Sequence, residues 1–160
     1  EENVLAVQCN LANTYSHLGR DEEANSLRRD VYSRRLRLLG EEHEQTLVAA
    51  LNYASSLVQL QRYQEVKSVL RKTMPVARRV LGESHDLTLR MRRIYALALY
   101  EDPAATLDDL REAVTTLEDT IRIARRVLGG VHPTTEGIEQ DLRDARAALR
   151  ARETPPPGSA

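Results

Sequence analysis

The 160-residue chain contains no tryptophan, no phenylalanine and a single cysteine, Cys9. Without the two largest apolar side chains, any core must be built from leucine, valine, isoleucine, alanine and tyrosine. One cysteine cannot form a disulfide within the chain, which excludes a disulfide-stapled scaffold and favours a reducing compartment such as the cytoplasm.

An excess of charge of either sign is also absent. The 23 lysines and arginines nearly balance the 24 aspartates and glutamates, for a formal net charge of −1. The sequence therefore predicts no general attraction to nucleic acid or to a membrane surface. It has no apolar run of membrane-spanning length and no signal peptide at its start. The first residue is not methionine and lies within a repeat pattern, so we expect a piece of a longer protein.

The most informative feature that is present is a recurring string, Leu-Gly-x-x-His. It occurs as LLGEEHEQTL at 38–47, VLGESHDLTL at 80–89 and VLGGVHPTTE at 127–136. Gly40 and Gly82 are 42 residues apart, and Gly82 and Gly129 are 47 apart. A fixed period in this range is typical of helical solenoids, in which stacked units share one continuous core.

Each repeat contains two stretches of helical apolar periodicity. We predict helices at about 3–18, 22–39, 46–60, 63–81, 87–100 and 108–128, followed by a polar-faced helix at 134–152. A glycine ends the second helix of each pair, Ser84 or Thr88 is expected to cap the fifth helix, and Asp102 or Thr106 the sixth. The five extra residues of the third unit fall near Glu101–Thr106.

The predicted organisation is one domain over 1–153. Its repeats span about 1–42, 43–84 and 85–131, a capping helix spans 132–153, and residues 154–160 (TPPPGSA) form a disordered tail.

The repeats resemble tetratricopeptide repeats, specifically the 42-residue variety of the kinesin light chain family. The first unit carries the matching pattern Asn10-Leu11-Ala12, Tyr15, Gly19 and Glu23-Ala24, and the second keeps Asn52-Tyr53-Ala54. The resemblance covers about residues 1–136. It implies an all-α, right-handed α-solenoid of three helix pairs plus a C-terminal capping helix, with the first helix of each pair lining a concave binding surface.

No residue pattern indicates catalysis or a metal site. His43, His85 and His132 occupy equivalent repeat positions, but metal ligands must converge on one ion, whereas stacked units hold such positions apart. We interpret these histidines as loop residues that pack or cap a helix. Cys9 and His17 lie two turns apart with no third group to orient the histidine. The sequence therefore predicts a non-enzyme without catalytic residues, metal or cofactor.

The concave surface supplies the candidate site. Arg90 and Arg93 are expected to bind acidic groups, Asn13 and Asn52 to hydrogen-bond a peptide backbone, and Leu51 to accept an apolar side chain. The complete candidate groove consists of Asn13, His17, Leu51, Asn52, Ser55, Gln59, Arg90, Arg93, Leu97 and Tyr100. Arginine pairs such as Arg28-Arg29 are interpreted as a solvated outer face, and the alternative is a basic convex stripe for an acidic partner.

The groove also resembles, in part, the two-carboxylate clamp of chaperone-binding tetratricopeptide domains. Asn13, Asn52 and Arg90 match three clamp positions. Cys9 and Ile94 stand where that pattern has cations, and Arg93 is a neighbouring replacement for the second.

The predicted function is a non-catalytic protein-interaction module, monomeric or weakly self-associating. Its expected ligand is an extended or short helical peptide with acidic and aliphatic residues. The alternatives are part of a kinesin-light-chain-like cargo adaptor, the C-terminal sensor of a signalling NTPase, and a structural spacer that stacks on itself.

Overall fold

The computed structural model describes residues 2–154, and this part of the chain is entirely helical, with no strand. Every helix predicted from the sequence is present, with ends within two residues of the prediction. Of the predicted tail, all but Thr154 lies outside the described residues. The helices are α1 (Glu2–His17), α2 (Asp21–Leu39), α3 (Glu44–Gln59), α4 (Tyr63–Leu81), α5 (Asp86–Tyr100), α6 (Leu107–Val127) and α7 (Pro133–Glu153).

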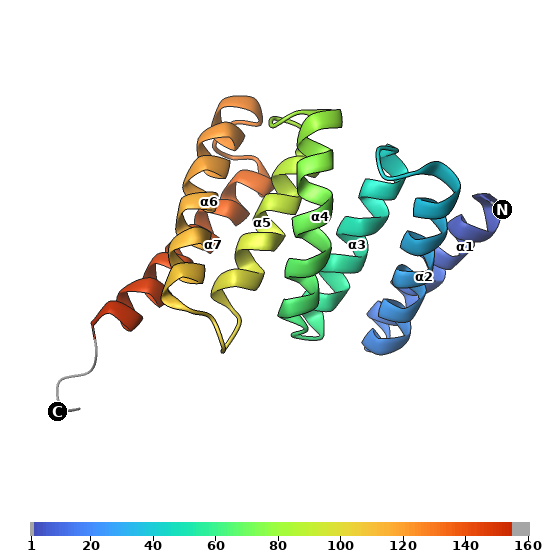
Figure 1. Ribbon diagram of the computed structural model, residues 1–160, viewed down its shortest axis with the longest axis horizontal. Helices are drawn as coiled ribbons and strands as arrows, with labels where there is room; N and C mark the ends of the chain where they lie inside the picture. The colour runs from blue at the N-terminus through green and yellow to red at the C-terminus, as the bar shows by residue number, and fades with distance from the viewer. Residues whose placement is uncertain (1, 155–160) are drawn as a thin grey trace. The chain divides into compact units, whose positions relative to one another are not determined.

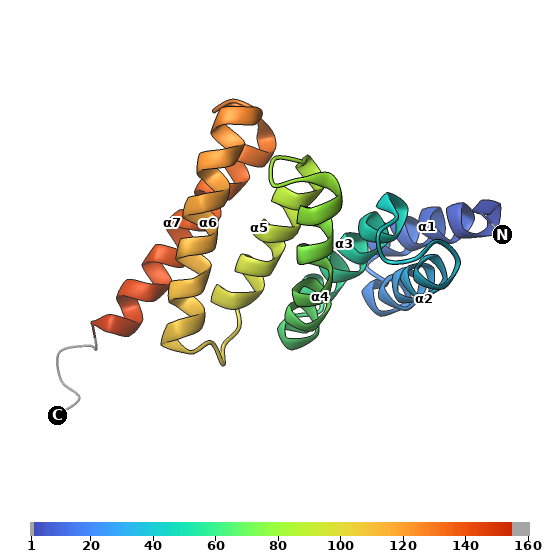
Figure 2. The ribbon, with the colours of Figure 1, turned by 45° about the horizontal axis from the view of Figure 1, so that its top comes forward.

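The helices fall into two compact units, residues 1–82 and residues 83–160. In the first unit, α2 packs against α1 and α3, and α4 packs against α3 (Figure 1). In the second unit, α6 packs against both α5 and α7, and α7 also contacts α5 (Figure 2). The single domain over 1–153 stays a prediction.

Small residues at matched positions let the two helices of each pair approach closely. Ala12, Ala54 and Ala96, on the first helices, have no exposed surface. Their counterparts on the second helices, Ala24, Val66 and Ala113, are equally buried. A buried polar link adds specificity between neighbouring pairs in the first unit, where the Ser56 hydroxyl donates to Asn25 Oδ1 at 2.8 Å.

The Leu-Gly-x-x-His strings end one helix and begin the next. Gly40, Gly82 and Gly129 have φ angles of 84°, 94° and 87°, which favour glycine. Nδ1 of His43, His85 and His132 accepts a backbone N–H at 3.2 Å at the start of α3, α5 and α7. The expectation that Ser84 or Thr88 caps α5 is therefore wrong. His85 supplies the acceptor, and Thr88 lies buried inside the helix.

The turns inside the pairs differ between the repeats. Gly19 (φ 71°) and Gln61 (φ 56°) occupy equivalent places in the first two pairs. In the third pair the Glu101–Thr106 loop replaces this turn. There Thr106 forms a capping box with Asp109 at the start of α6, which confirms the prediction for Thr106. None of the helices in the described range has the length and apolarity needed to cross a membrane.

Candidate peptide-binding site

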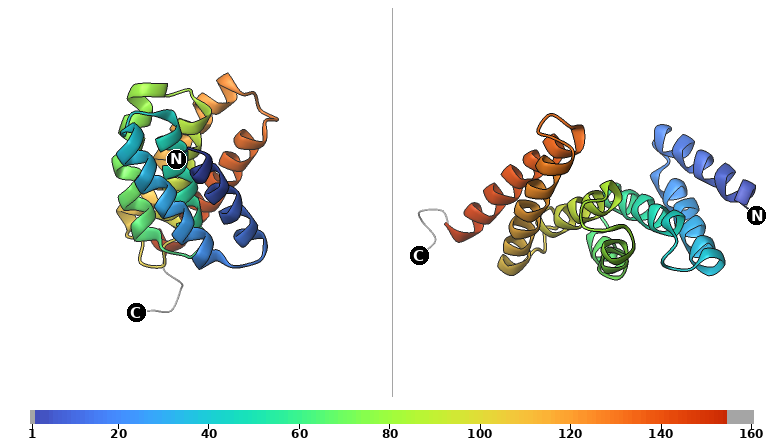
Figure 3. Two further views of the ribbon diagram at one scale, coloured as in Figure 1. Left: turned by 90° about the vertical axis from the view of Figure 1, so that its right-hand side faces the viewer. Right: turned by 90° about the horizontal axis from the view of Figure 1, so that it is seen from above.

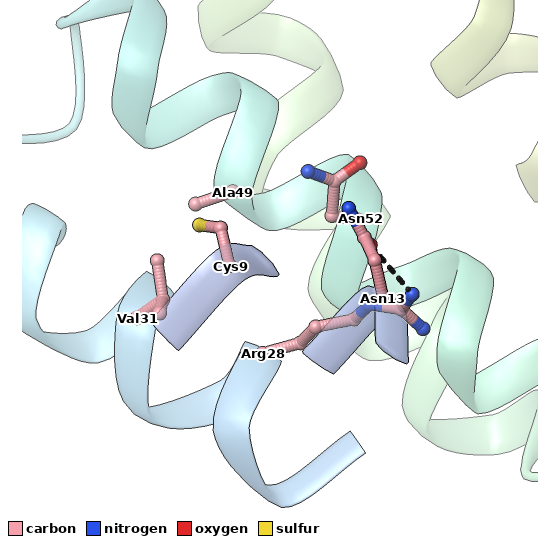
Figure 4. Close-up of a pocket in the computed structure, with 6 residues that line it drawn as sticks. All are labelled: Cys9, Asn13, Arg28, Val31, Ala49 and Asn52. Carbon is pink, nitrogen blue, oxygen red and sulfur yellow. Dashed lines mark hydrogen bonds between the residues drawn. The ribbon is translucent and has the colours of Figure 1, made fainter. Parts of the chain in front are cut away.

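A small pocket opens between α1, α2 and α3 in the first unit. Its volume is about 40 Å³, and two side chains from each of the three helices line it (Figure 4). One wall consists of aliphatic side chains and a thiol, and the other carries two carboxamides and a guanidinium. The lining residues are Cys9, Asn13, Arg28, Val31, Ala49 and Asn52.

Arg28 supplies the charge of this pocket. Its Nη2 donates a hydrogen bond to Asn13 Oδ1 at 3.2 Å (Figure 4). Burial lowers the pKa of the Arg28 guanidinium, while the charge of Asp21 acts in the opposite direction. Arginine stays protonated at neutral pH even so. Within residues 2–154 no carboxylate lies at ion-pair distance from Arg28, so its partly desolvated charge is not neutralised.

The local sequence explains why Arg28 points inward. It follows buried Ala24 by four residues and precedes buried Val31 by three, which places all three on one face of α2. The expectation that Arg28 belongs to a solvated outer face is therefore wrong. It holds for its neighbour Arg29, which is exposed. The helical spacing is the signal that could have identified Arg28 from the sequence.

The other candidate residues of the first unit separate into three groups. Asn13 and Asn52, from the neighbouring first helices, both line the pocket. Leu51 lies in the core with 2% of its surface exposed, so the expectation that it accepts a ligand side chain is wrong. His17 and Gln59 are exposed and Ser55 is half-buried, and none of these three lines the pocket.

In the second unit, Arg93 and Tyr100 of α5 converge on one carboxylate of α7. Arg93 Nε donates to Asp141 Oδ2 at 2.5 Å, and the Tyr100 hydroxyl donates to Asp141 Oδ1 at 3.4 Å. Asp141 is buried and 33% of the Arg93 side chain is exposed, so the ion pair is only partly withdrawn from solvent. The expectation that Arg93 offers its charge to an acidic ligand is therefore wrong, because the chain itself supplies the anion.

Two further features fit this internal ion pair. Burial, followed by the charge of Asp141, raises the pKa of the Tyr100 hydroxyl, which keeps it protonated as a donor. Gly137 lies one turn before Asp141 on α7, where a Cβ would overlap the Arg93 guanidinium. The missing side chain at this position thus makes room for the arginine.

Arg90 and Leu97, the remaining candidates on α5, take no part in the ion pair. Arg90 is exposed and lies 3.9 Å from Asp86, one turn earlier on the same helix. An exposed pair of this kind contributes little to stability. Leu97 is half-buried.

Comparison with known proteins agrees with the helix pairs. Two family models, both described as tetratricopeptide repeat, match residues 3–78 and 105–134. The chain belongs to the tetratricopeptide repeat family. No curated protein matches it in a sequence search.

Solved structures match the tetratricopeptide chain over nearly its whole length. Two are of a putative kinesin light chain with nearly identical TPR-like repeats from Podosopora anserina, one of them a single-residue variant. Each has a TM-score of 0.80 and 24% identity, and the alignments cover 90% and 92% of this chain. BtubC (BKLC) from P. vanneervenii has a TM-score of 0.68 and 15% identity over 98% of this chain. These likenesses confirm the predicted fold class. The chain spans 66–68% of the length of these structures.

In the tetratricopeptide register, the place between α1, α2 and α3 is equivalent to the place between α5, α6 and α7, although Arg28 and Arg93 are not equivalent to each other. Two repeats after Cys9 the sequence has Arg93, and two repeats after Asn52 it has Asp141. The counterpart of Arg28 in α6 is Leu117, which is fully buried. The place that forms an open pocket between α1, α2 and α3 is therefore closed between α5, α6 and α7 by an ion pair and a leucine.

The histidines of the loops between the repeats do not form a metal site in the described part of the chain. In residues 2–154, no group of three or more histidine, cysteine, aspartate or glutamate side chains is arranged to hold an ion. Each of the three repeat histidines instead uses Nδ1 as a helix cap.

Proposed function

We propose that this chain is a non-catalytic protein-interaction module whose pocket between α1, α2 and α3 binds a carboxylate of a partner peptide. The observation that carries the proposal is Arg28. Its guanidinium is half-buried beside the carboxamides of Asn13 and Asn52 and has no carboxylate partner among the described residues. A partly desolvated cation next to free hydrogen-bonding groups favours an anionic ligand.

The donors in the pocket suit a carboxylate. Arginine presents several N–H donors in a planar fork that can bind both carboxylate oxygens. Asn13 accepts the bond from Arg28 through its oxygen, which leaves its amide hydrogens available to donate. Asn52 lies on the neighbouring first helix with its side chain exposed, so it can reach a ligand without rearrangement.

The closed site in the second unit supports the same ligand class. In that unit the Asp141 carboxylate pairs with Arg93 of the same chain. The counterpart of Asp141 in the first unit is Asn52, which is neutral. An incoming glutamate, aspartate or C-terminal carboxylate would supply the missing charge.

The size of the pocket limits what enters it. A volume of about 40 Å³ holds one small group and not a whole side chain with its neighbours. The rest of a peptide would lie on the exposed surface of the first helices, where Asn13, His17, Asn52 and Gln59 offer polar contacts. In this proposal Arg28, and not Arg93, is the cation that binds the acidic group of the ligand.

The test uses two labelled peptides, acetyl-Gly-Leu-Glu-Leu-Gly-amide and its glutamine analogue, and ¹⁵N NMR of the protein. We expect the glutamate peptide to shift the side-chain signals of Asn13, Asn52 and Arg28, and the glutamine peptide to shift them much less. Arg28→Gln should weaken the glutamate peptide about ten-fold, the value of one charge-assisted hydrogen bond.

Arg29→Gln is the matched control, because Arg29 is the adjacent residue and its side chain is exposed on α2. This control should leave affinity nearly unchanged and reports any general loss of positive charge. Equal affinities of the Arg28→Gln variant and the parent protein would refute the proposal. The proposal applies equally to an isolated module and to a segment of a larger adaptor or sensor protein.

A further inference from the structure

A cleft lies between α2 and α4 in the first unit. Both helices pack against α3, and within the described residues they do not pack against each other. Figure 3 shows the two helices on the same side of α3. The cleft that remains between them has a volume of about 120 Å³, and residues of α2, α3, α4 and the loop before α3 line it.

The interior of the cleft is largely apolar. Leu47 and Val76 line it and are buried, while Leu36 lines it with 39% of its surface exposed. An apolar cavity of about 150 Å³ admits benzene, so a cleft of this smaller volume suits a branched group of about four carbon atoms. The Thr46 hydroxyl also lines the cleft without a hydrogen-bond partner in the described range. The equivalent threonines of the other repeats share this feature, so the hydroxyl does not by itself indicate a ligand.

Charges of opposite sign border the cleft. Glu41 and Lys72 both line it and are exposed, and neither forms an ion pair or a hydrogen bond with another described residue. The two groups are therefore too far apart to pair with each other. The adjacent Glu42, in contrast, pairs with Arg79 of α4 at 2.6 Å. The chain thus neutralises one carboxylate of this loop and leaves the carboxylate at the cleft without a cation.

Tyr32 adds a half-buried hydroxyl group to the cleft. Its ring stacks on Tyr53 with the ring centroids 6.2 Å apart, which holds the side chain in place. Burial, followed by the charge of Glu41, raises the pKa of the hydroxyl, so the group is protonated at neutral pH and can donate. No acceptor for it is present in residues 2–154. An oxygen atom of a ligand can therefore accept this hydrogen bond.

This set of polar groups is particular to the first unit. In the repeat register, Met74 and Asp119 stand at the positions of the tyrosine and the lysine, and Glu83 at that of the glutamate. One hydroxyl group and two opposite charges at these positions are therefore not a requirement of the repeat.

We propose that this cleft binds a free aliphatic α-amino acid of the size of leucine. The branched side chain enters the apolar interior. The ammonium group of the ligand lies against the Glu41 carboxylate, and its carboxylate accepts hydrogen bonds from Lys72 and from the Tyr32 hydroxyl. A zwitterion suits a cleft bordered by one charge of each sign, whereas a leucine inside a peptide carries neither charge. The cleft shares no lining residue with the carboxylate pocket, and the inference does not rest on the proposed function.

The test uses three probes, L-leucine, glycine and N-acetyl-L-leucinamide, and ¹³C methyl NMR of the protein. The methyl signals of Leu36, Leu47 and Val76 report this cleft separately from the carboxylate pocket. We expect L-leucine to shift these signals. Glycine lacks the branched side chain and N-acetyl-L-leucinamide lacks both charges, so each should bind at least about ten-fold more weakly.

Variants of the protein assign the binding to the cleft. Glu41→Gln should weaken L-leucine about five-fold and leave N-acetyl-L-leucinamide unchanged, because only L-leucine has an ammonium group. Glu42→Gln is the matched control, since it removes the same charge from the adjacent residue, and it should leave the affinity nearly unchanged. Leu36→Trp should abolish binding of both probes by filling the cleft. Leu38→Trp is its control, because Leu38 is exposed on the same helix and does not line the cleft.

Three outcomes would overturn the inference. The first is the absence of any shift with L-leucine at high millimolar concentration while the protein remains folded by circular dichroism. The second is an equal loss of affinity in Glu41→Gln and Glu42→Gln. The third is binding of N-acetyl-L-leucinamide as tight as that of L-leucine, which would assign the cleft to a leucine side chain of a partner protein.

Discussion

The two units differ in how the charge of a partly buried arginine is neutralised. The second unit pairs Arg93 of α5 with its own buried Asp141, whereas the equivalent positions of the first unit hold Cys9 and Asn52, and Arg28 of α2 lies beside them without a carboxylate. Both arginines are partly withdrawn from water. The Arg93–Asp141 ion pair links α5 to α7. Arg28 has no carboxylate partner among the described residues, so its charge can interact with an anion from outside the chain. Under the proposed function, equivalent places in two repeats serve the fold in one unit and a ligand in the other, depending on whether the chain supplies the anion.

The largest expected effect is on stability. Arg93→Ala leaves the buried Asp141 carboxylate without its cation and should lower the free energy of unfolding by about 3 kcal/mol. Arg28→Ala removes a cation that no carboxylate opposes and should lower it by less than about 1 kcal/mol. Urea unfolding of both variants measures this contrast. The double variant Arg93→Leu with Asp141→Leu should recover most of the loss, and equal losses for the two arginines would contradict the comparison.

The second prediction converts the open pocket into a closed one. Asn52→Asp gives the first unit the carboxylate that Asp141 gives the second, so Arg28 becomes neutralised within the chain. The glutamate peptide should then bind about ten-fold more weakly. Fluorescence anisotropy measures the affinity, and Ser55→Asp adds the same charge outside the pocket as a control. If the two variants lose the same affinity, the effect is one of general charge.

A third, smaller effect concerns Gly137. Gly137→Ala should lower the free energy of unfolding by about 1 kcal/mol, because the added methyl group displaces the pinned Arg93 guanidinium. In the Arg93→Ala background the same change should instead raise it by about 1 kcal/mol through helix propensity. Thermal or urea unfolding of the four proteins forms a double-mutant cycle. A change of the same sign in both backgrounds would show that Arg93 does not need the space.

The smallest expected effect is a dependence on alkaline pH. Burial raises the pKa of Tyr100 in the folded protein, so its contribution to stability is present below the ordinary tyrosine value of about 10 and is lost as pH rises above it. Tyr100→Phe should remove this part of the alkaline loss. Unfolding measured at neutral and alkaline pH tests it, and an identical pH profile in the variant would count against a protected hydroxyl.

Much of the fold could be predicted because its determinants are local. Apolar periodicity located every helix, and the recurring glycines and histidines located their ends. The alanines that recur every 42 residues, Ala12, Ala54 and Ala96, lie at the close contacts between paired helices. These features depend on residues within one or two turns of each other, so the sequence displays them directly.

The site was less predictable because it depends on side chains that are distant in sequence. Arg93 and Asp141 are 48 residues apart, and nothing in the α5 sequence signals that its arginine is already paired. The repeat position of Leu51 predicts a groove residue, although packing buries it. Arg28 was not predicted because the family resemblance points to the first helix of each pair, while the charge of the pocket comes from a second helix.

The histidine caps carry a consequence for the tautomer of the loop histidines. An imidazole that accepts a hydrogen bond at Nδ1 must hold its proton on Nε2, so His43, His85 and His132 share one tautomer. The three loops that begin α3, α5 and α7 therefore repeat one hydrogen-bonding arrangement, in which each ring keeps its Nε2–H as its remaining donor.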